Sequence, residues 1–211
     1  MPGPTPLPNG RAEAFARRRQ RIAQEIERAA LELFASHGAS EVTTEQIAEA
    51  AGISVRTFFR YFPTRDDVLA ALPRRQNEQM CRRVAARPAS ESILEAFIAA
   101  AHEPLEKAEE DMVRLWGRAI RRAPVRELQG GSADDGMVAA FGAVIAARLG
   151  VKRSDRRARL LATAIASVTW FTFMEWIESG AKQPLSKMME SSIDVLAELN
   201  RQTGRQRRRL A

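Results

Sequence analysis

The chain has 211 residues, of which 45% are hydrophobic and 28% charged, and its formal net charge at neutral pH is +7. This length and composition are typical of a globular protein with a substantial buried core. A single cysteine, Cys81, excludes an internal disulfide and a cysteine metal cluster. The longest apolar run, residues 160–173, is shorter than the ~18 residues of a membrane span, and the N-terminus lacks a signal-peptide pattern. We therefore expect a cytoplasmic protein without a membrane partner.

The positive charge is concentrated near the two ends of the chain. Five arginines lie within residues 11–21 and five within residues 201–211, whereas residues 23–67 hold four arginines and eight acidic residues. We predict a disordered basic arm over residues 1–16, rich in proline at its start, and a disordered basic tail over residues 201–211. Arg11 in this arm could reach a minor groove. Arginines that bind DNA between the two ends must face the phosphates while the acidic residues face away.

The first predicted helix runs from about residue 17 to residue 37 and ends at Gly38. Its apolar residues recur at three- and four-residue spacing, which gives a helix one buried face. They are Ile22, Ile26, Ala29, Ala30, Leu33 and Phe34.

Two short helices joined by a tight turn follow. Thr43 and Gln46 predict a capping box at the start of the first, and Gly52 ends it because glycine adopts the left-handed conformation at low cost. Ser54 begins the second short helix, which Pro63 ends. A helix, a glycine turn and a second helix form the arrangement that reads DNA in helix-turn-helix proteins.

The sequence of residues 42–68, VTTEQIAEAAGISVRTFFRYFPTRDDV, closely resembles the DNA-binding domain of TetR-family transcriptional regulators. The resemblance extends back over residues 22–38. It implies an all-α fold with a three-helix helix-turn-helix domain, here residues 17–66, and a C-terminal helical ligand-binding and dimerisation domain, here residues 67–200. It also implies a homodimer in which the last two helices of each chain form a four-helix bundle.

Nine residues are candidate DNA contacts. Thr44 lies at a helix N-terminus, where a hydroxyl and a backbone N–H can bind phosphate. Arg56 and Thr57 open the reading helix, where an arginine can bind guanine with two hydrogen bonds and a threonine methyl can meet thymine. The alternatives are plain capping for Thr43 and a solvated side chain for Arg56. The candidates are Thr43, Thr44, Ser54, Val55, Arg56, Thr57, Arg60, Tyr61 and Arg65.

The family resemblance implies phosphate contacts for Arg60, Tyr61 and Arg65. Phe59 departs from the family pattern, because a tyrosine whose hydroxyl meets phosphate often stands at this position. Arg65 replaces the commoner lysine and keeps the positive charge.

The C-terminal half is predicted to be helical, and Pro73 is expected to kink or break the helix that begins near residue 64. A long helix is predicted over residues 154–179. Its residues 160–177 are apolar nearly all round, so a partner chain is expected to cover the side that one chain leaves open. A last helix follows over residues 184–200. A two-fold dimer reads two half-sites, so the expected partner is double-stranded DNA with a palindromic operator. The dimer-interface candidates are Leu161, Ile165, Val168, Ile193 and Leu196.

Aromatic and methionine side chains are concentrated in the C-terminal half and are candidates for an apolar pocket. Ligand pockets are mostly apolar with a few polar anchors, so we expect a small apolar or amphipathic effector. The alternative for each side chain is that it packs in the core. The candidates are Phe97, His102, Met112, Trp116, Phe141, Trp170, Phe173 and Met174.

These features indicate a sequence-specific DNA-binding transcriptional regulator, most simply a repressor that a small molecule releases from its operator. The alternatives are a DNA-binding regulator without a ligand and an enzyme on a helical scaffold. Against the enzyme, the two histidines lack metal-ligand spacing, and the sequence has no nucleophile elbow, P-loop or dinucleotide-binding motif. We expect no catalytic residue, metal or cofactor. Cys81 is flanked by Arg82 and Arg83, which lower a thiol pKa, so it is either a redox sensor or, more simply, an inert cysteine.

Overall fold

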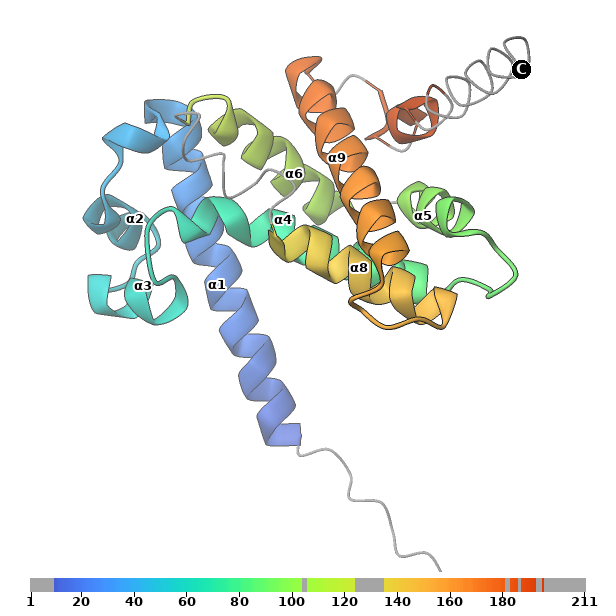
Figure 1. Cartoon of the computed structure of the whole chain (residues 1–211). Helices are drawn as coiled ribbons and strands as arrows, with labels where there is room; N and C mark the ends of the chain where they lie inside the picture. The colour runs from blue at the N-terminus through green and yellow to red at the C-terminus, as the bar shows by residue number, and fades with distance from the viewer. Residues whose placement is uncertain are drawn as a thin grey trace, which may run out of the picture.

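A computed structural model of the chain describes residues 10–103, 106–123, 135–180, 183–185, 187–192 and 195. Every regular element in this part of the chain is helical, and the predicted all-α fold is confirmed (Figure 1). The α-helices are α1 (Gly10–His37), α2 (Thr44–Ala50), α3 (Val55–Tyr61), α4 (Asp67–Ala86), α5 (Ile93–His102), α6 (Lys107–Ile120), α8 (Asp135–Leu149) and α9 (Arg156–Glu178). A short 3-10 helix, η1 (Ala39–Glu41), lies between α1 and α2.

The two short helices α2 and α3 begin with the local contacts that the sequence predicts. Thr43 Oγ1 accepts a hydrogen bond from the backbone N–H of Gln46 at 3.3 Å, and the Gln46 side chain accepts one from the Thr43 N–H at 2.8 Å. Gly52 follows α2 with φ +66°, the left-handed conformation that other residues disfavour. Ser54 Oγ then accepts a hydrogen bond from the Thr57 N–H at 3.1 Å and caps α3. The predicted helix starts and the glycine turn are therefore confirmed.

α1 begins at Gly10, well before its predicted start near residue 17. The prediction of a disordered arm is therefore wrong for residues 10–16, which are helical. Alanine, glutamate and arginine make up most of residues 11–19 and are strong helix formers. They add turns to a helix whose second half already packs in the core, so no new helix has to be nucleated.

The apolar residues form two clusters that both draw on α4 and α9. The first holds α2 and α3 against α1 and continues into α6 and α9 through Trp116 and Trp176. The second packs the end of α4 against α5, α8 and α9 around Phe97 and Phe141. α4 therefore runs from one core into the other. Figure 1 shows it passing from the reading helices to α8. The boundary predicted near residue 66, between the reading domain and the C-terminal domain, therefore lies within the first core cluster, to which both predicted domains contribute.

Pro73 lies inside α4, which continues through it, so of the predicted kink or break the break is excluded. A proline lacks the N–H that would bond to the carbonyl of Leu69, four residues earlier. Trp116 of α6 fills this gap, because its indole N–H donates to that carbonyl at 2.7 Å.

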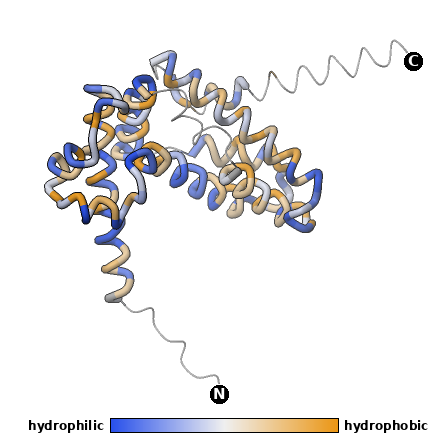
Figure 2. The backbone as a smooth tube through the Cα atoms, turned by 60° about the vertical axis from the view of Figure 1, so that its left-hand side comes forward, coloured by the Kyte–Doolittle hydropathy of each residue, from blue (hydrophilic) through white to orange (hydrophobic). Residues whose placement is uncertain are grey.

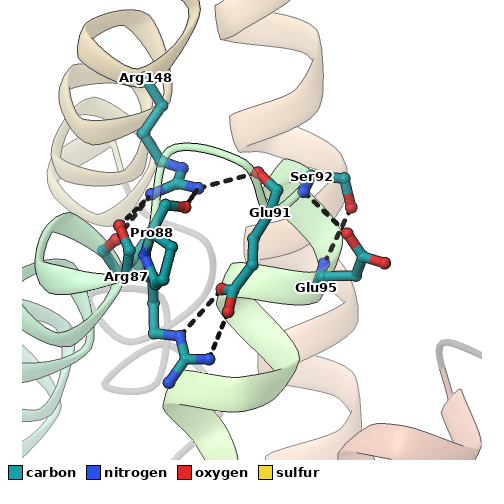
Figure 3. Close-up of polar contacts among 7 residues, drawn as sticks. Arg87, Pro88, Glu91, Ser92, Glu95 and Arg148 are labelled. Carbon is teal, nitrogen blue, oxygen red and sulfur yellow. Dashed lines mark hydrogen bonds and ion pairs between the residues drawn. The ribbon is translucent and has the colours of Figure 1, made fainter.

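The C-terminal end of α4 is tied to α8 by Arg148 (Figure 3). The Arg148 guanidinium donates to four backbone carbonyls, those of Val84 at 3.3 Å, Arg87 at 3.0 Å, Pro88 at 2.8 Å and Glu91 at 2.9 Å. The last carbonyls of a helix have no donor within the helix, so Arg148 stabilises them and the loop beyond. Arg87 and Glu91 form an ion pair across the same loop. α8 and the end of α4 are thus held as one unit.

α9 carries the long apolar run. By length and composition alone this 23-residue helix could cross a membrane. The prediction from the sequence excluded a membrane span because it considered only the apolar run of residues 160–173. α9 is longer than this run because it continues past it at both ends. Core helices of soluble proteins meet the same criterion. Ala158, Ala162, Ala166 and Trp176 of α9 are buried in the core of the protomer, so one side of α9 belongs to that core.

Candidate nucleic-acid interface

Buried aromatic rings fix α3 on the rest of the reading domain. Phe58 is fully buried and Phe62 nearly so, and their ring centroids are 5.7 Å apart. Both rings belong to the first core cluster, together with Ile47 of α2. Arg56 and Arg60 of α3 are exposed. The packing therefore leaves one side of α3 open as a surface that can enter a groove of DNA.

The start of α3 presents the residues predicted to contact bases. The hydroxyls of Ser54 and Thr57 lie 2.9 Å apart, and both residues take part in capping the helix. Val55 is half-buried between them. Arg56 is exposed, and none of the described residues forms an ion pair or a hydrogen bond with it. Arg56 is therefore the side chain at this position that is available to bind a base edge.

The start of α2 presents Thr43 and Thr44. The Thr43 hydroxyl is engaged in the capping box, which is the alternative role that its sequence position suggests. Thr44 is the first residue of α2 and is half-buried. Backbone N–H groups in the first turn of a helix have no partner within the helix, so this end of α2 can receive a phosphate.

The end of α3 carries Arg60 and Tyr61, the candidates for phosphate contacts. The Arg60 guanidinium carbon lies 5.4 Å from the centroid of the Tyr61 ring, which places the cation over the aromatic face. Phe59 is 50% exposed and meets the edge of Phe58 at a centroid distance of 5.6 Å. The open side of α3 therefore combines positive charge with one exposed aromatic ring.

Arg65, a predicted phosphate contact, has structural partners within the reading domain. Its Nη1 donates to the carbonyl of Ala39 at 2.7 Å and to that of Val42 at 3.0 Å, and its Nε and Nη2 contact the Asp66 carboxylate at 3.0 and 2.9 Å. The guanidinium thus ties the segment before α2 to the start of α4. These acceptors, distant in sequence, occupy the guanidinium within the domain, and the phosphate contact of Arg65 stays a prediction.

The residues predicted to line an apolar pocket pack in two separate cores. Met112 and Trp116 belong to the first cluster. Phe97 and Phe141 belong to the second cluster, where the centroids of their two rings are 5.1 Å apart. Trp170 packs against both clusters. In this conformation they form packed core, which was the alternative interpretation, rather than the wall of one open cavity.

The remaining pocket candidates are less buried. Phe173 packs against Trp116 at a centroid distance of 5.5 Å, and Met174 is half-buried. His102 is exposed, and its Nε2 lies 3.8 Å from the Glu190 carboxylate. His102 is therefore on the surface and does not anchor a ligand inside the aromatic group.

A cavity of about 450 Å³ lies instead between α1, α4 and α6. Its lining is largely charged, with Arg28 from α1, Arg75 from α4 and Glu109 from α6, and Met112 is the one pocket candidate that borders it. Periodicity could not reveal this cavity, because its charged lining resembles an ordinary solvated helix face.

A buried ion pair borders this cavity. Glu27 of α1 is 0% exposed, and its carboxylate accepts hydrogen bonds from the two terminal nitrogens of Arg75 at 2.6 and 3.1 Å. Burial raises the pKa of Glu27, and the hydrogen bonds and charge of Arg75 act in the opposite direction. The pair links α1 of the reading domain to the first half of α4.

Three of the predicted dimer-interface residues follow one another at i, i+4 and i+7 on α9 and so share one face, but the core of the protomer covers them to different extents. Leu161 is exposed and Val168 half-buried, so both are available to a partner chain. Ile165 is buried in the second core cluster of its own protomer, which corrects its assignment to the interface. The other two candidates, Ile193 and Leu196, lie outside the described residues.

Cys81 is half-buried, and burial raises its pKa to about 11 despite the neighbouring Arg82. The thiol is therefore protonated near neutral pH, which favours the inert cysteine over the redox sensor. Within the described ranges, no group of three His, Cys, Asp or Glu side chains could hold a metal ion.

Known proteins resemble this chain in sequence and in fold. A family model described as "Bacterial regulatory proteins, tetR family" matches residues 26–72. The HTH-type transcriptional regulator TcmR of Streptomyces glaucescens is 29% identical over 194 residues, which cover 85% of this chain and 84% of that protein.

Solved structures share the fold at lower identity. NalD of Pseudomonas aeruginosa, the secondary repressor of the MexAB-OprM multidrug efflux pump, is 17% identical with a TM-score of 0.58 and covers 85% of this chain and 96% of its own. FadR of Bacillus subtilis in complex with stearoyl-CoA is 19% identical with a TM-score of 0.51 and covers 82% of this chain and 96% of its own.

Proposed function

Because the chain belongs to the TetR family and is a DNA-binding transcriptional regulator, we propose that it is a homodimeric repressor released from a palindromic operator by a small molecule. The observation that carries this proposal is the open side of α3. Arg56 is exposed there and bonds to none of the residues that the structure describes, while Phe58 on the other side of the helix is fully buried and fixes its orientation. A reading helix must be packed firmly against its domain and must also present a side chain that is available to contact bases. The proposed place of action is the cytoplasm, where the operator is found.

The DNA contacts follow from this arrangement. Arg56 reads a base edge, with Val55 and Thr57 beside it at the start of α3. Thr44 and the N-terminus of α2 bind one phosphate, and Arg60 with Tyr61 bind another. Selectivity then requires a second copy, because one helix reads few base pairs and a two-fold dimer reads two half-sites about 34–36 Å apart.

An exposed apolar stripe on α9 supports the dimer. Leu160 is 54% and Phe171 67% exposed, and Ala164 lies exposed between them at helical spacing. Exposed apolar side chains in a contiguous row favour association, since burial contributes about 25 cal/mol per Å² of apolar surface.

The effector is proposed to be an apolar or amphipathic molecule that binds between the two core clusters, near Trp170. FadR of Bacillus subtilis, whose fold is similar, is described in complex with stearoyl-CoA, an amphipathic thioester. In this chain such a molecule must separate packed side chains, so it would select a minor conformation. Release of DNA requires that the effector prefer the released form by several kcal/mol.

The test begins with selection of duplexes from a random pool by the full-length protein. A two-fold symmetric consensus is expected, and a pool that emerges without one would contradict the operator proposal. All three tryptophans, Trp116, Trp170 and Trp176, lie in or against the first core cluster, so an effector there should change the intrinsic fluorescence. Acyl-CoA esters of increasing chain length are the first probes. A regulator without a ligand, the alternative that the packed cores favour, would show neither a fluorescence change nor release of the operator.

A further inference from the structure

α1 extends beyond the reading domain as a free-standing helix. Residues 12–21 are all exposed, and Ile22 is the first residue of α1 that packs against the first core cluster. Figures 1 and 2 show this segment projecting from the reading domain, away from the helices of the C-terminal half. The extension, defined here as residues 10–21, has no apolar contact within the described chain that would explain its helical form.

The extension is strongly basic. It contains five arginines and a single glutamate. Arg17 pairs with Glu13 at 3.4 Å, but both are exposed, and exposed ion pairs contribute little. Arg18 and Arg19 have neither an ion pair nor a hydrogen bond among the residues that the structure describes. Adjacent arginines repel one another, so this segment is suited to a polyanion.

One face of the extension is turned toward the reading helices. Phe15, Arg19 and Ile22 follow one another at i, i+4 and i+7 and so share a face of α1. Ile22 carries this face into the core that holds α2 and α3. Gln24 and Arg28, on the opposite side of α1, line the cavity against α4 and α6. Arg19, together with Phe15 at 71% exposure, therefore lies on the side of α1 that α2 and α3 pack against, rather than on the side that faces α4 and α6.

We propose that the extension lies along the phosphate backbone of the DNA that flanks each operator half-site. At about 1.5 Å per residue it is roughly 18 Å long, which spans about five base pairs at 3.4 Å each. A helix presents Arg18 and Arg19 at fixed positions, unlike an irregular arm in a minor groove, and the phosphates relieve the repulsion among the arginines. This inference rests on the proposed function, because α3 must first place the domain on a half-site.

The test compares four proteins on two duplexes, the selected operator alone and the same operator with about ten more base pairs on each side. The proteins are the wild type, the double variant Arg18→Gln/Arg19→Gln, the variant Ala16→Pro and the control Arg153→Gln/Arg156→Gln. Ala16→Pro breaks the helix without changing its charge. The control removes the same charge from two exposed residues, Arg153 in the loop before α9 and Arg156 at the first position of α9. Kd is measured by fluorescence anisotropy over a salt series, and circular dichroism checks the fold.

The wild type and the control should bind the longer duplex about tenfold more tightly than the bare operator at low salt. Arg18→Gln/Arg19→Gln should lose this gain and reduce the salt slope by about two units per protomer. Ala16→Pro should also lose the gain. An unchanged gain in the double arginine variant overturns the inference, and an unchanged gain in Ala16→Pro overturns its helical geometry. A wild type that selects no operator contradicts the proposed function itself. A wild type that binds the bare operator through Arg56 but gains nothing from the longer duplex contradicts only the inference about the extension.

Discussion

Trp116 supplies α4 with the hydrogen bond that Pro73 cannot make. The indole N–H of Trp116 donates at 2.7 Å to the carbonyl of Leu69, the group that the N–H of residue 73 would otherwise satisfy. Trp116 is 1% exposed and packs against Phe173 of α9. The continuity of α4, which leads into the reading domain, thus depends on a side chain held by the helices proposed to receive the effector.

Trp116→Phe should destabilise the protein by about 1–3 kcal/mol, because it leaves the buried Leu69 carbonyl without a donor. In a Pro73→Ala background the restored backbone N–H satisfies that carbonyl, so the same substitution should cost about 1 kcal/mol less. Denaturant unfolding of the four proteins of this double-mutant cycle measures the coupling. Strictly additive effects would show that the indole N–H does not compensate for Pro73.

Arg56→Ala should lower operator affinity by about 1–3 kcal/mol and relax selectivity at one base position of each half-site. Arg60→Ala is the matched change at the other end of α3, and it should weaken binding to all sequences alike and reduce the salt slope by about one unit. Anisotropy titrations against the operator and its single-base variants distinguish the two. If both variants show the same sequence-independent loss, Arg56 does not read a base.

Arg65→Lys separates a structural role from a DNA contact. A lysine keeps the charge but cannot reproduce the guanidinium bonds to Ala39, Val42 and Asp66. We expect a loss of about 1–3 kcal/mol in unfolding free energy, with the salt slope of DNA binding unchanged. Wild-type stability with weakened binding would restore Arg65 as a phosphate contact.

Arg75→Met should destabilise the protein by about 3–5 kcal/mol at neutral pH, because Glu27 remains buried without its partner. Burial already raises the pKa of Glu27 above its ordinary 4.5, and Arg75 is the group that lowers it. A raised folded-state pKa means that stability is greatest below 4.5 and is lost as pH rises through that value toward the folded pKa. The deficit of Arg75→Met should therefore shrink as pH falls toward 4.5.

The control for this pH series is Glu27→Gln/Arg75→Met, which removes the titrating group. It should recover much of the lost stability at neutral pH and show little dependence on pH over the same range. Urea unfolding at several pH values tests both proteins. A deficit in Arg75→Met that stays constant with pH would show that Glu27 is not the group responsible.

Phe171→Glu places a charge in the exposed apolar stripe of α9 and should yield a folded monomer without selective operator binding. Burial of an unpaired charge at a dry interface costs several kcal/mol, while the same side chain is harmless in a solvated monomer. Lys152→Glu, an exposed change outside α9, is the control. Sedimentation at micromolar concentration measures the outcome, and a dimeric Phe171→Glu protein would exclude this face from the interface.

Short-range signals in the sequence determined the reading domain. Thr43 with Gln46 and Ser54 with Thr57 act over three residues, and Gly52 takes its positive φ because no other residue does so at low cost. Such contacts form between chain neighbours whatever the rest of the molecule does. For this reason the positions of α2, α3 and their turn could be predicted, and so could an all-α fold.

Only the tertiary structure decided features that depend on residues distant in the chain. Arg65 has the sequence signature of an exposed cation, yet carbonyls 26 and 23 residues earlier hold it inside the domain. Trp116 finds its acceptor 47 residues away, and Arg75 finds Glu27 48 residues away. Ile165 lies on an apolar helix whose sides look alike in the sequence, but it faces its own core. Periodicity specifies which sides of a helix are apolar, whereas the free energy of packing whole helices determines which of those sides meet.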